Sequence, residues 1–157
     1  MKLQGKTILI TGSTAGIGEA MARRFHAEGA NIVLHGLEEA DGQALLSELG
    51  ERAILKISDL SNPNAPCELV EIAQESFGGI DALVNNAAVI PRATLHETDA
   101  QLFDQTMAVN ARAPLLLIQA ATESLAKNQG VVVNIGSINA YCGEANLLAY
   151  SMSKGAL

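Results

Sequence analysis

Apolar residues follow two alternating patterns along this chain. Short, mostly apolar runs predict five strands, at residues 6–11, 31–35, 53–57, 81–85 and 130–135. Longer segments with apolar residues every three or four positions predict helices at 16–28, 38–49, 63–77 and 99–127, and the start of another helix from Leu147. We expect Pro114 to kink or divide the helix at 99–127 near Asn110, because proline cannot continue the backbone hydrogen bonding.

Strands that alternate with helices and are apolar on both faces favour a parallel sheet covered on both sides. The chain has no internal repeat and no linker-like stretch, so we predict one α/β domain over residues 1–157, with a doubly wound parallel sheet. Residues 151–157 lack a cap or a turn signal, and we therefore expect a fold truncated after the fifth strand and the start of the next helix.

Composition and charge narrow the class of protein. An apolar content of 48% and a charged content of 17% exclude a disordered chain. The net charge of −7 and the lack of a basic run argue against nucleic acid or an anionic membrane as a partner. Two cysteines, three scattered histidines and no apolar leader predict a cytoplasmic protein with reduced thiols and no metal site.

Three glycines mark the turn between the first strand and the first helix. Gly12, Gly16 and Gly18 lie in the segment TGSTAGIG, where they allow a tight turn, a close approach to a pyrophosphate and close helix packing. The helix start adds free N–H groups for an anion. Glycines at such a turn can also be purely structural, so the three glycines alone are a weak signal. Their position after the first strand, at the start of a helix, is what favours a nucleotide site.

The choice between NAD and NADP depends on the end of the second strand. No aspartate stands there to hold a ribose, and neither Ala15, Gly36 nor Leu37 is a cation for a 2′-phosphate. The nearby Glu38 tilts the prediction toward NAD. We interpret His35 as an exposed strand-end residue, with a place in the adenosine pocket as the alternative.

A tyrosine and a lysine form the candidate acid–base pair. Tyr150 stands four residues before Lys154, so both side chains project from the same helix face. A nearby ammonium favours the phenolate form of a tyrosine, which suits proton exchange with an alcohol or a carbonyl. Ser137 follows the fifth strand, at the sheet edge where open α/β sheets bind ligands, and its hydroxyl can hold a substrate oxygen.

Together these residues resemble the short-chain dehydrogenase/reductase family. The matching motifs are TGSTAGIG, Asp59-Leu60, NNAA at 85–88, Asn110, Ser137 and YSMSK at 150–154. The resemblance covers essentially the whole chain and implies a Rossmann-like fold. Ala88 departs from it, because the family has glycine there; alanine is costly only if that backbone needs a positive φ.

The resemblance also implies residue roles. Tyr150 is expected to be the general acid–base, Ser137 to orient the substrate oxygen, and Lys154 to bind the nicotinamide ribose and favour the tyrosine phenolate. Asn110 is expected to hold a water that continues the proton relay. The expected cofactor contacts are Gly12, Ser13, Thr14, Gly16, Ile17, Gly18, Asp59, Leu60, Asn86 and Ala87, together with Tyr150 and Lys154.

The resulting hypothesis is an oxidoreductase that transfers a hydride between NAD or NADP and a secondary alcohol or ketone. One alternative is a catalytically inactive nucleotide-binding module, if the chain truly ends at Leu157; another is an epimerase or lyase on the same scaffold. The apolar segments at 99–127 and from Leu147 onward, together with the resemblance, predict a homodimer or homotetramer.

Overall fold

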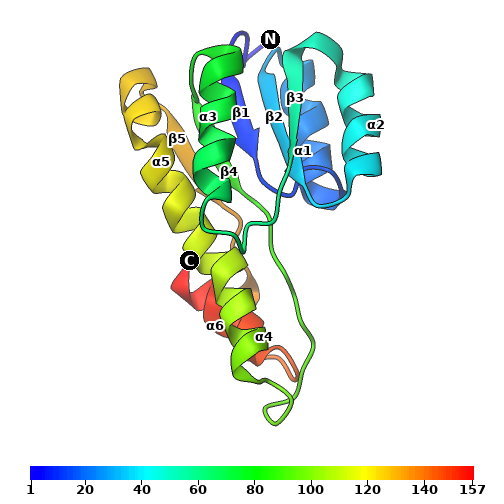
Figure 1. Ribbon diagram of the computed structural model, residues 1–157, viewed down its shortest axis with the longest axis vertical. Helices are drawn as coiled ribbons and strands as arrows, with labels where there is room; N and C mark the ends of the chain where they lie inside the picture. Colours follow the sequence, from blue (N-terminus) through cyan, green and yellow to red (C-terminus); the bar gives the residue numbers. More distant parts are fainter.

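The computed structural model describes residues 1–157, which form a parallel sheet flanked by helices (Figure 1). The strand order is β3-β2-β1-β4-β5, and every pairing is parallel. The strands are β1 (Thr7–Ile10), β2 (Asn31–Gly36), β3 (Ala53–Ile57), β4 (Ala82–Asn85) and β5 (Val131–Asn134). The doubly wound parallel sheet predicted from the sequence is confirmed.

Six α-helices connect or follow the strands. They are α1 (Gly16–Ala27), α2 (Glu39–Leu49), α3 (Ala65–Phe77), α4 (Ala100–Met107), α5 (Ala113–Asn128) and α6 (Leu148–Ala156). Two short 3-10 turns, Gly50–Arg52 and Ile138–Ala140, were not predicted, because three residues are too few to show a period. No helix is both long and apolar enough to cross a membrane.

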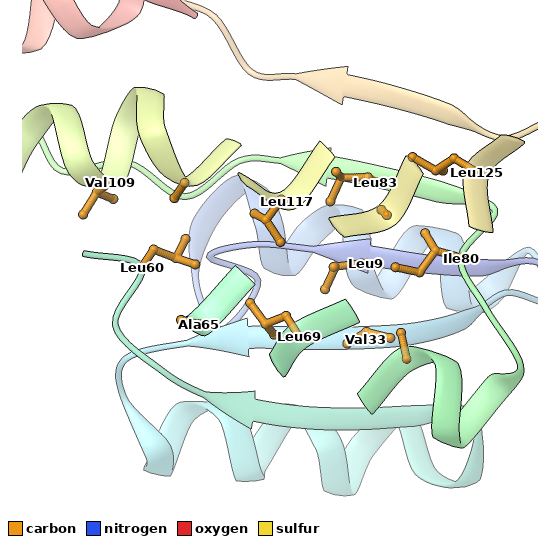
Figure 2. Packing of buried hydrophobic residues seen from close by; sticks show 13 residues of the cluster. Leu9, Val33, Leu60, Ala65, Leu69, Ile80, Leu83, Val109, Leu117 and Leu125 are labelled. Carbon is orange, nitrogen blue, oxygen red and sulfur yellow. The ribbon is translucent and has the colours of Figure 1, made fainter. Parts of the chain in front are cut away.

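The sheet separates two apolar cores, because successive residues of a strand point to opposite faces. Ile8 and Ile10 of β1 face α1 and α2, whereas Leu9 faces α3 and α5. Figure 2 shows the second core, in which Leu69 of α3 and Leu117 of α5 gather with Leu9 on one face of the sheet. Both cores hold the strand ends in fixed positions, and with them the loops that follow those ends.

Strand β5 does not fit the prediction of strands covered on both faces. Val131, Val132 and Val133 are 57%, 38% and 45% exposed, whereas every residue of β1 is buried. The physical reason is position: β5 is an edge strand, and α1 and α2 pack on β1, β2 and β3 rather than on it. An apolar run therefore predicted the strand correctly but not its burial.

The long helical segment is divided where the sequence predicts. A π-helix at Ala108–Arg112 separates α4 from α5, and the N–H of Ala113 bonds to the carbonyl of Ala108, five residues back. Pro114 stands in the first turn of α5 and has no N–H to offer the carbonyl of Asn110. The widened turn places Asn110 in the interior, 1% exposed. Such π-bulges occur frequently at functional sites.

Candidate functional site

A cleft of about 610 Å³ opens at the carboxyl ends of β1, β2, β3 and β4. The strand order reverses between β1 and β4, so the loops that follow these two strands diverge and leave a crevice. The residues of the sequence-predicted site that line this cleft are Gly12, Thr14, Gly16, Ile17, Asp59, Leu60, Asn86 and Ala87. Residues far apart in the sequence are thus brought together at the sheet edge where a ligand is expected.

The three glycines of the turn meet three different requirements. Gly12 has φ +63°, and a Cβ there would lie 2.9 Å from the Cα of Ala87. Gly16 has φ +56° with open space around it, so its backbone is accessible to a ligand. A Cβ on Gly18 would lie 2.2 Å from the carbonyl oxygen of Gly12, which makes glycine necessary for α1 to pack against the turn.

The first turn of α1 presents backbone donors to the cleft. Ala15 is its N-cap and makes no side-chain cap bond, and the helical bonding starts with the N–H of Glu19 to the carbonyl of Ala15. The N–H groups of Gly16, Ile17 and Gly18 therefore have no intrahelical acceptor. A helix start with free donors beside open glycine backbone suits an anionic group such as a pyrophosphate.

His35 corrects one expectation. We expected an exposed residue, but it is 2% exposed and lines the cleft. Its Nδ1 accepts the N–H of Gly12 at 3.1 Å, and its Nε2 lies 2.9 Å from the carbonyl oxygen of Ser58. Burial lowers the pKa of His35, and the bond to Ser58 and the charge of Asp59 oppose this only in part. The pattern of hydrophobic residues could not predict these contacts, because Gly12 and Ser58 come from other loops.

At the end of β2, the floor of the cleft leaves no room for a side chain at position 36. A Cβ on Gly36 would lie 2.2 Å from the Oγ1 of Thr14, so no larger residue fits there without movement of that threonine. Next to it Leu37 is 61% exposed, and Glu38 also lines the cleft. No cation belongs to this lining.

The segment after β3 forms one wall. Asp59 is exposed, and its Oδ1 accepts the N–H of Ser61 at 2.8 Å in a tight turn, while Leu60 is buried. The Oγ of Ser58 is buried and has no hydrogen-bond partner, so a polar atom in this wall is left for a ligand or a water. Sequence reasoning missed Ser58, although its position at a strand end signalled it.

The segment after β4 secures the turn from the other side. The Nδ2 of Asn86 donates to the carbonyls of Thr11 and Gly12 at 2.9 and 3.0 Å. The Oγ1 of Thr11 accepts the N–H groups of Asn86 and Ala87 at 3.0 and 3.1 Å. Ala88 does not adopt a positive φ, so alanine at this position carries no backbone strain.

Tyr150 and Lys154 lie one turn apart on α6, and both are buried. The Nζ of Lys154 donates to the carbonyl of Ile135 at 2.7 Å, and burial lowers the pKa of this lysine. Ile135 stands two residues before Ser137, so the lysine is tied to the loop that carries the serine. The Oγ of Ser137 accepts the N–H of Asn139 at 3.2 Å.

The side chain of Asn110 is fully engaged in hydrogen bonds. Its Oδ1 accepts the N–H of Val89 at 2.8 Å, and its Nδ2 donates to the carbonyl of Val89 and to the Oγ of Ser153, both at 2.9 Å. Ser153 in turn donates to the carbonyl of Tyr150 at 2.7 Å. Asn110 therefore links the loop after β4 to the helix of Tyr150 and Lys154. Sequence reasoning missed Ser153, although it lies within the YSMSK motif.

The predicted residues form two groups. Ser13 and Gly18 support the cleft without lining it, Ser13 by accepting the N–H of His35 at 2.9 Å on its Oγ. Asn110, Ser137, Tyr150 and Lys154 do not line the cleft either; three of them lie on or beside α6, which packs against α4 beyond the strand ends (Figure 1). Further lining residues not predicted include Ala88, Val89, Ile90, Gln105 and Val109.

The fold and the cleft define a class: an α/β protein with a glycine-rich, anion-compatible crevice at the switch point of a parallel sheet. Comparison with known proteins gives the family. The sequence profile of the short chain dehydrogenase family matches residues 6–157, and the chain belongs to this family.

Individual relatives agree with this assignment. The chain is 37% identical to an uncharacterized oxidoreductase of Thermotoga maritima, with 100% of this chain and 63% of that protein covered. It is 36% identical to the L-fucose dehydrogenase of Mus musculus, with 99% and 57% covered. The chain therefore spans about three fifths of the length of these relatives.

Solved structures agree as well. A blue fluorescent protein from a metagenomic library, in complex with NADPH, superposes with a TM-score of 0.93 at 36% identity, over 99% of this chain and 66% of that one. A metagenomic short-chain oxidoreductase in complex with NADP gives 0.93 at 32% identity, over 100% and 73%.

Proposed function

We propose that this chain belongs to an NAD(P)-dependent oxidoreductase that interconverts a secondary alcohol and a ketone. The observation that carries the proposal is the arrangement on α6: Tyr150 and Lys154 lie one turn apart, and the lysine is tied to the loop of Ser137 through the carbonyl of Ile135. Membership of the short chain dehydrogenase family supports it.

The cleft fits a nicotinamide dinucleotide. The free N–H groups of α1 and the open backbone of Gly16 suit the pyrophosphate, and the wall at Asp59 and Leu60 suits the adenine. Such a cofactor supplies or accepts the hydride; the protein provides binding, orientation and proton transfer.

Three side chains and one backbone group would carry out the proton chemistry. The Tyr150 hydroxyl donates a proton to the substrate oxygen in reduction, and the Tyr150 phenolate accepts the proton of the alcohol in oxidation. Ser137 holds that oxygen, and Lys154 binds the nicotinamide ribose. Because the side chain of Asn110 is already fully bonded, we assign the relay water to its backbone rather than to its amide.

The cofactor proposal covers both NAD and NADP. The sequence tilts toward NAD because no cation stands at Ala15, Gly36 or Leu37 and Glu38 is close, and no cation lines the cleft. The two comparison structures hold NADPH and NADP, which does not support that preference. Competition between NADH and NADPH for the purified protein separates the two.

The decisive variant is Tyr150→Phe. It removes the proton donor while keeping the ring that packs in α6, so we expect at least a hundredfold loss of turnover with cofactor affinity unchanged. Turnover is followed as NAD(P)H absorbance with a panel of secondary alcohols that includes L-fucose, and affinity by NAD(P)H fluorescence. Near-normal turnover of this variant would contradict the assignment of Tyr150.

A nucleotide-binding module without catalysis is the second candidate. It is favoured by one observation: the cleft is lined without any contribution from Ser137, Tyr150 or Lys154. Saturable binding of NAD(P)H, with no turnover of any substrate and no effect of Tyr150→Phe on any property, would support the module over the enzyme.

A further inference from the structure

The ring of His35 bridges two segments of the cleft wall. Its Nδ1 meets the N–H of Gly12 at 3.1 Å, and its Nε2 meets the carbonyl of Ser58 at 2.9 Å. A carbonyl oxygen can only accept, so Nε2 carries the proton and Nδ1 is the lone-pair acceptor for Gly12. Only the neutral ring, in this one tautomer, can make both bonds.

We propose that His35 is a positioning residue for the dinucleotide cleft, whose neutral ring holds the glycine-rich turn in its binding conformation and whose protonation weakens cofactor binding. The ligand named here rests on the proposed function. The bond to Gly12 is the one at stake, because a protonated Nδ1 would direct its own N–H against the N–H of Gly12.

The backbone of His35 is held in place independently of its ring. The backbone of His35 is bonded separately to Ser13: the N–H of Ser13 donates to the carbonyl of His35 at 2.7 Å, and the Oγ of Ser13 accepts the N–H of His35 at 2.9 Å. These two bonds do not depend on the charge of the ring. Gly12 lies two residues after the end of β1 with φ +63°, so its ring contact fixes the entry to the turn.

The charged groups around the ring set the direction of the pH effect. The glycine-rich turn contributes no charged side chain, and Asp59, from the segment after β3, is the charge that acts on the imidazole. Burial outweighs the attraction of this carboxylate and lowers the pKa of His35. The unfolded chain therefore takes up the proton first, and stability falls as the pH drops below about 6.5. Cofactor binding falls at a lower pH, where the ring of the folded protein itself takes up the proton.

NADH is the appropriate probe for this effect. A phosphate monoester titrates near pH 6, so the 2′-phosphate of NADPH would add its own pH dependence. We expect the dissociation constant of NADH, measured by fluorescence from pH 7.5 down to the lowest pH at which the fold persists, to rise roughly three- to tenfold as the ring is protonated, the effect of one hydrogen bond.

Two substitutions separate the hydrogen-bond acceptor of the ring from its ability to take up a proton. In His35→Asn, the side-chain amide oxygen reaches the position of Nδ1 and accepts from Gly12 at every pH, so we expect near wild-type affinity and a flat profile. In His35→Leu no acceptor remains, so we expect an affinity three- to tenfold weaker than that of the wild type. The pH profile of this variant should also be flat. His96→Asn, on an exposed loop residue, is the matched control and should keep the wild-type profile.

A geometric readout is independent of the cofactor. The amide resonance of Gly12 should titrate together with the imidazole of His35 in the wild type, and should not titrate in His35→Asn. Identical pH profiles of NADH binding in the wild type and His35→Asn would overturn the inference, as would a Gly12 amide that does not respond to pH. Failure of NADH to bind even at pH 7.5 would instead overturn the proposed function, and the Gly12 titration would still decide whether the ring positions the turn.

Discussion

The glycine-rich turn shows how much a single residue can determine. Gly12 and Gly16 need the left-handed backbone, whereas Gly18 needs only the absence of a side chain, because the carbonyl of Gly12 occupies the space of a Cβ. The motif spacing predicted all three positions. The distinct reason for each became visible only with the fold, since the neighbours of Gly12 come from the segment after β4.

Gly18→Ala is expected to be costly. A Cβ placed 2.2 Å from a backbone oxygen forces α1 away from the turn, and we expect a loss of about 1–3 kcal/mol in the free energy of unfolding together with weaker NADH binding. Urea unfolding and fluorescence titration measure the two effects. Gly143→Ala is the control, because nothing lies within 4 Å of a Cβ there; equal losses in both variants would contradict the packing argument.

His35 marks the limit of residue-level prediction. A histidine at the end of a β-branched strand is compatible with either exposure or burial, and the sequence favoured exposure. Burial follows from the loops after β1 and β3, which supply Gly12 and Ser58 as partners. Such contacts join residues more than twenty positions apart and leave no local signal.

At the scale of elements, the division of the long helix was predictable and its consequence was not. Pro114 indicated a break near Asn110, and the π-helix lies there. The hydrogen bond from Asn110 to Ser153 joins residues 43 positions apart, so the local periodicity of apolar residues could not predict it. It attaches α6, and with it Tyr150 and Lys154, to the widened turn between α4 and α5.

Breaking this attachment should destabilise α6. We expect Ser153→Ala to lower the free energy of unfolding by about 1–3 kcal/mol, because a buried amide donor loses an acceptor. Thermal unfolding measures the loss, and a double-mutant cycle with Asn110→Leu should give coupling above about 0.5 kcal/mol. Ser151→Ala, two residues away, is the control: its buried Oγ has no partner, so we expect no loss. Additive effects of Asn110→Leu and Ser153→Ala would refute the link.

At the scale of the whole molecule, the parallel sheet and the alternation of its strands with helices followed from the apolar patterns, and the glycine motif indicated where the cleft lies. The exposure of β5 did not, because a run of valines carries the same signal in an edge strand and a central one. Apolar residues also lie exposed on the helices, with Leu115 of α5 at 64% and Met152 of α6 at 51%.

We propose that this apolar helix surface joins copies of the protein in a homodimer or homotetramer. Leu115→Glu places a charge in the contact, so we expect the mass measured by sedimentation at micromolar concentration to fall toward that of a monomer. Leu95→Glu changes an equally exposed leucine on a loop and should leave the mass unchanged. A monomeric wild type would contradict the proposal.

The strand order has a consequence for the time course of folding. Ile8 of β1 pairs with Ile32 on one side, 24 residues away, and with Ala82 on the other, 74 residues away. During synthesis, β1, β2 and β3 can therefore associate with α1 and α2 while one edge of β1 is still unpaired. That edge consists of four buried, mostly apolar residues, and until β4 arrives it is open to the strands of neighbouring nascent chains. The central strand of the finished sheet is thus the part of the molecule most exposed to misassembly while the chain is being made.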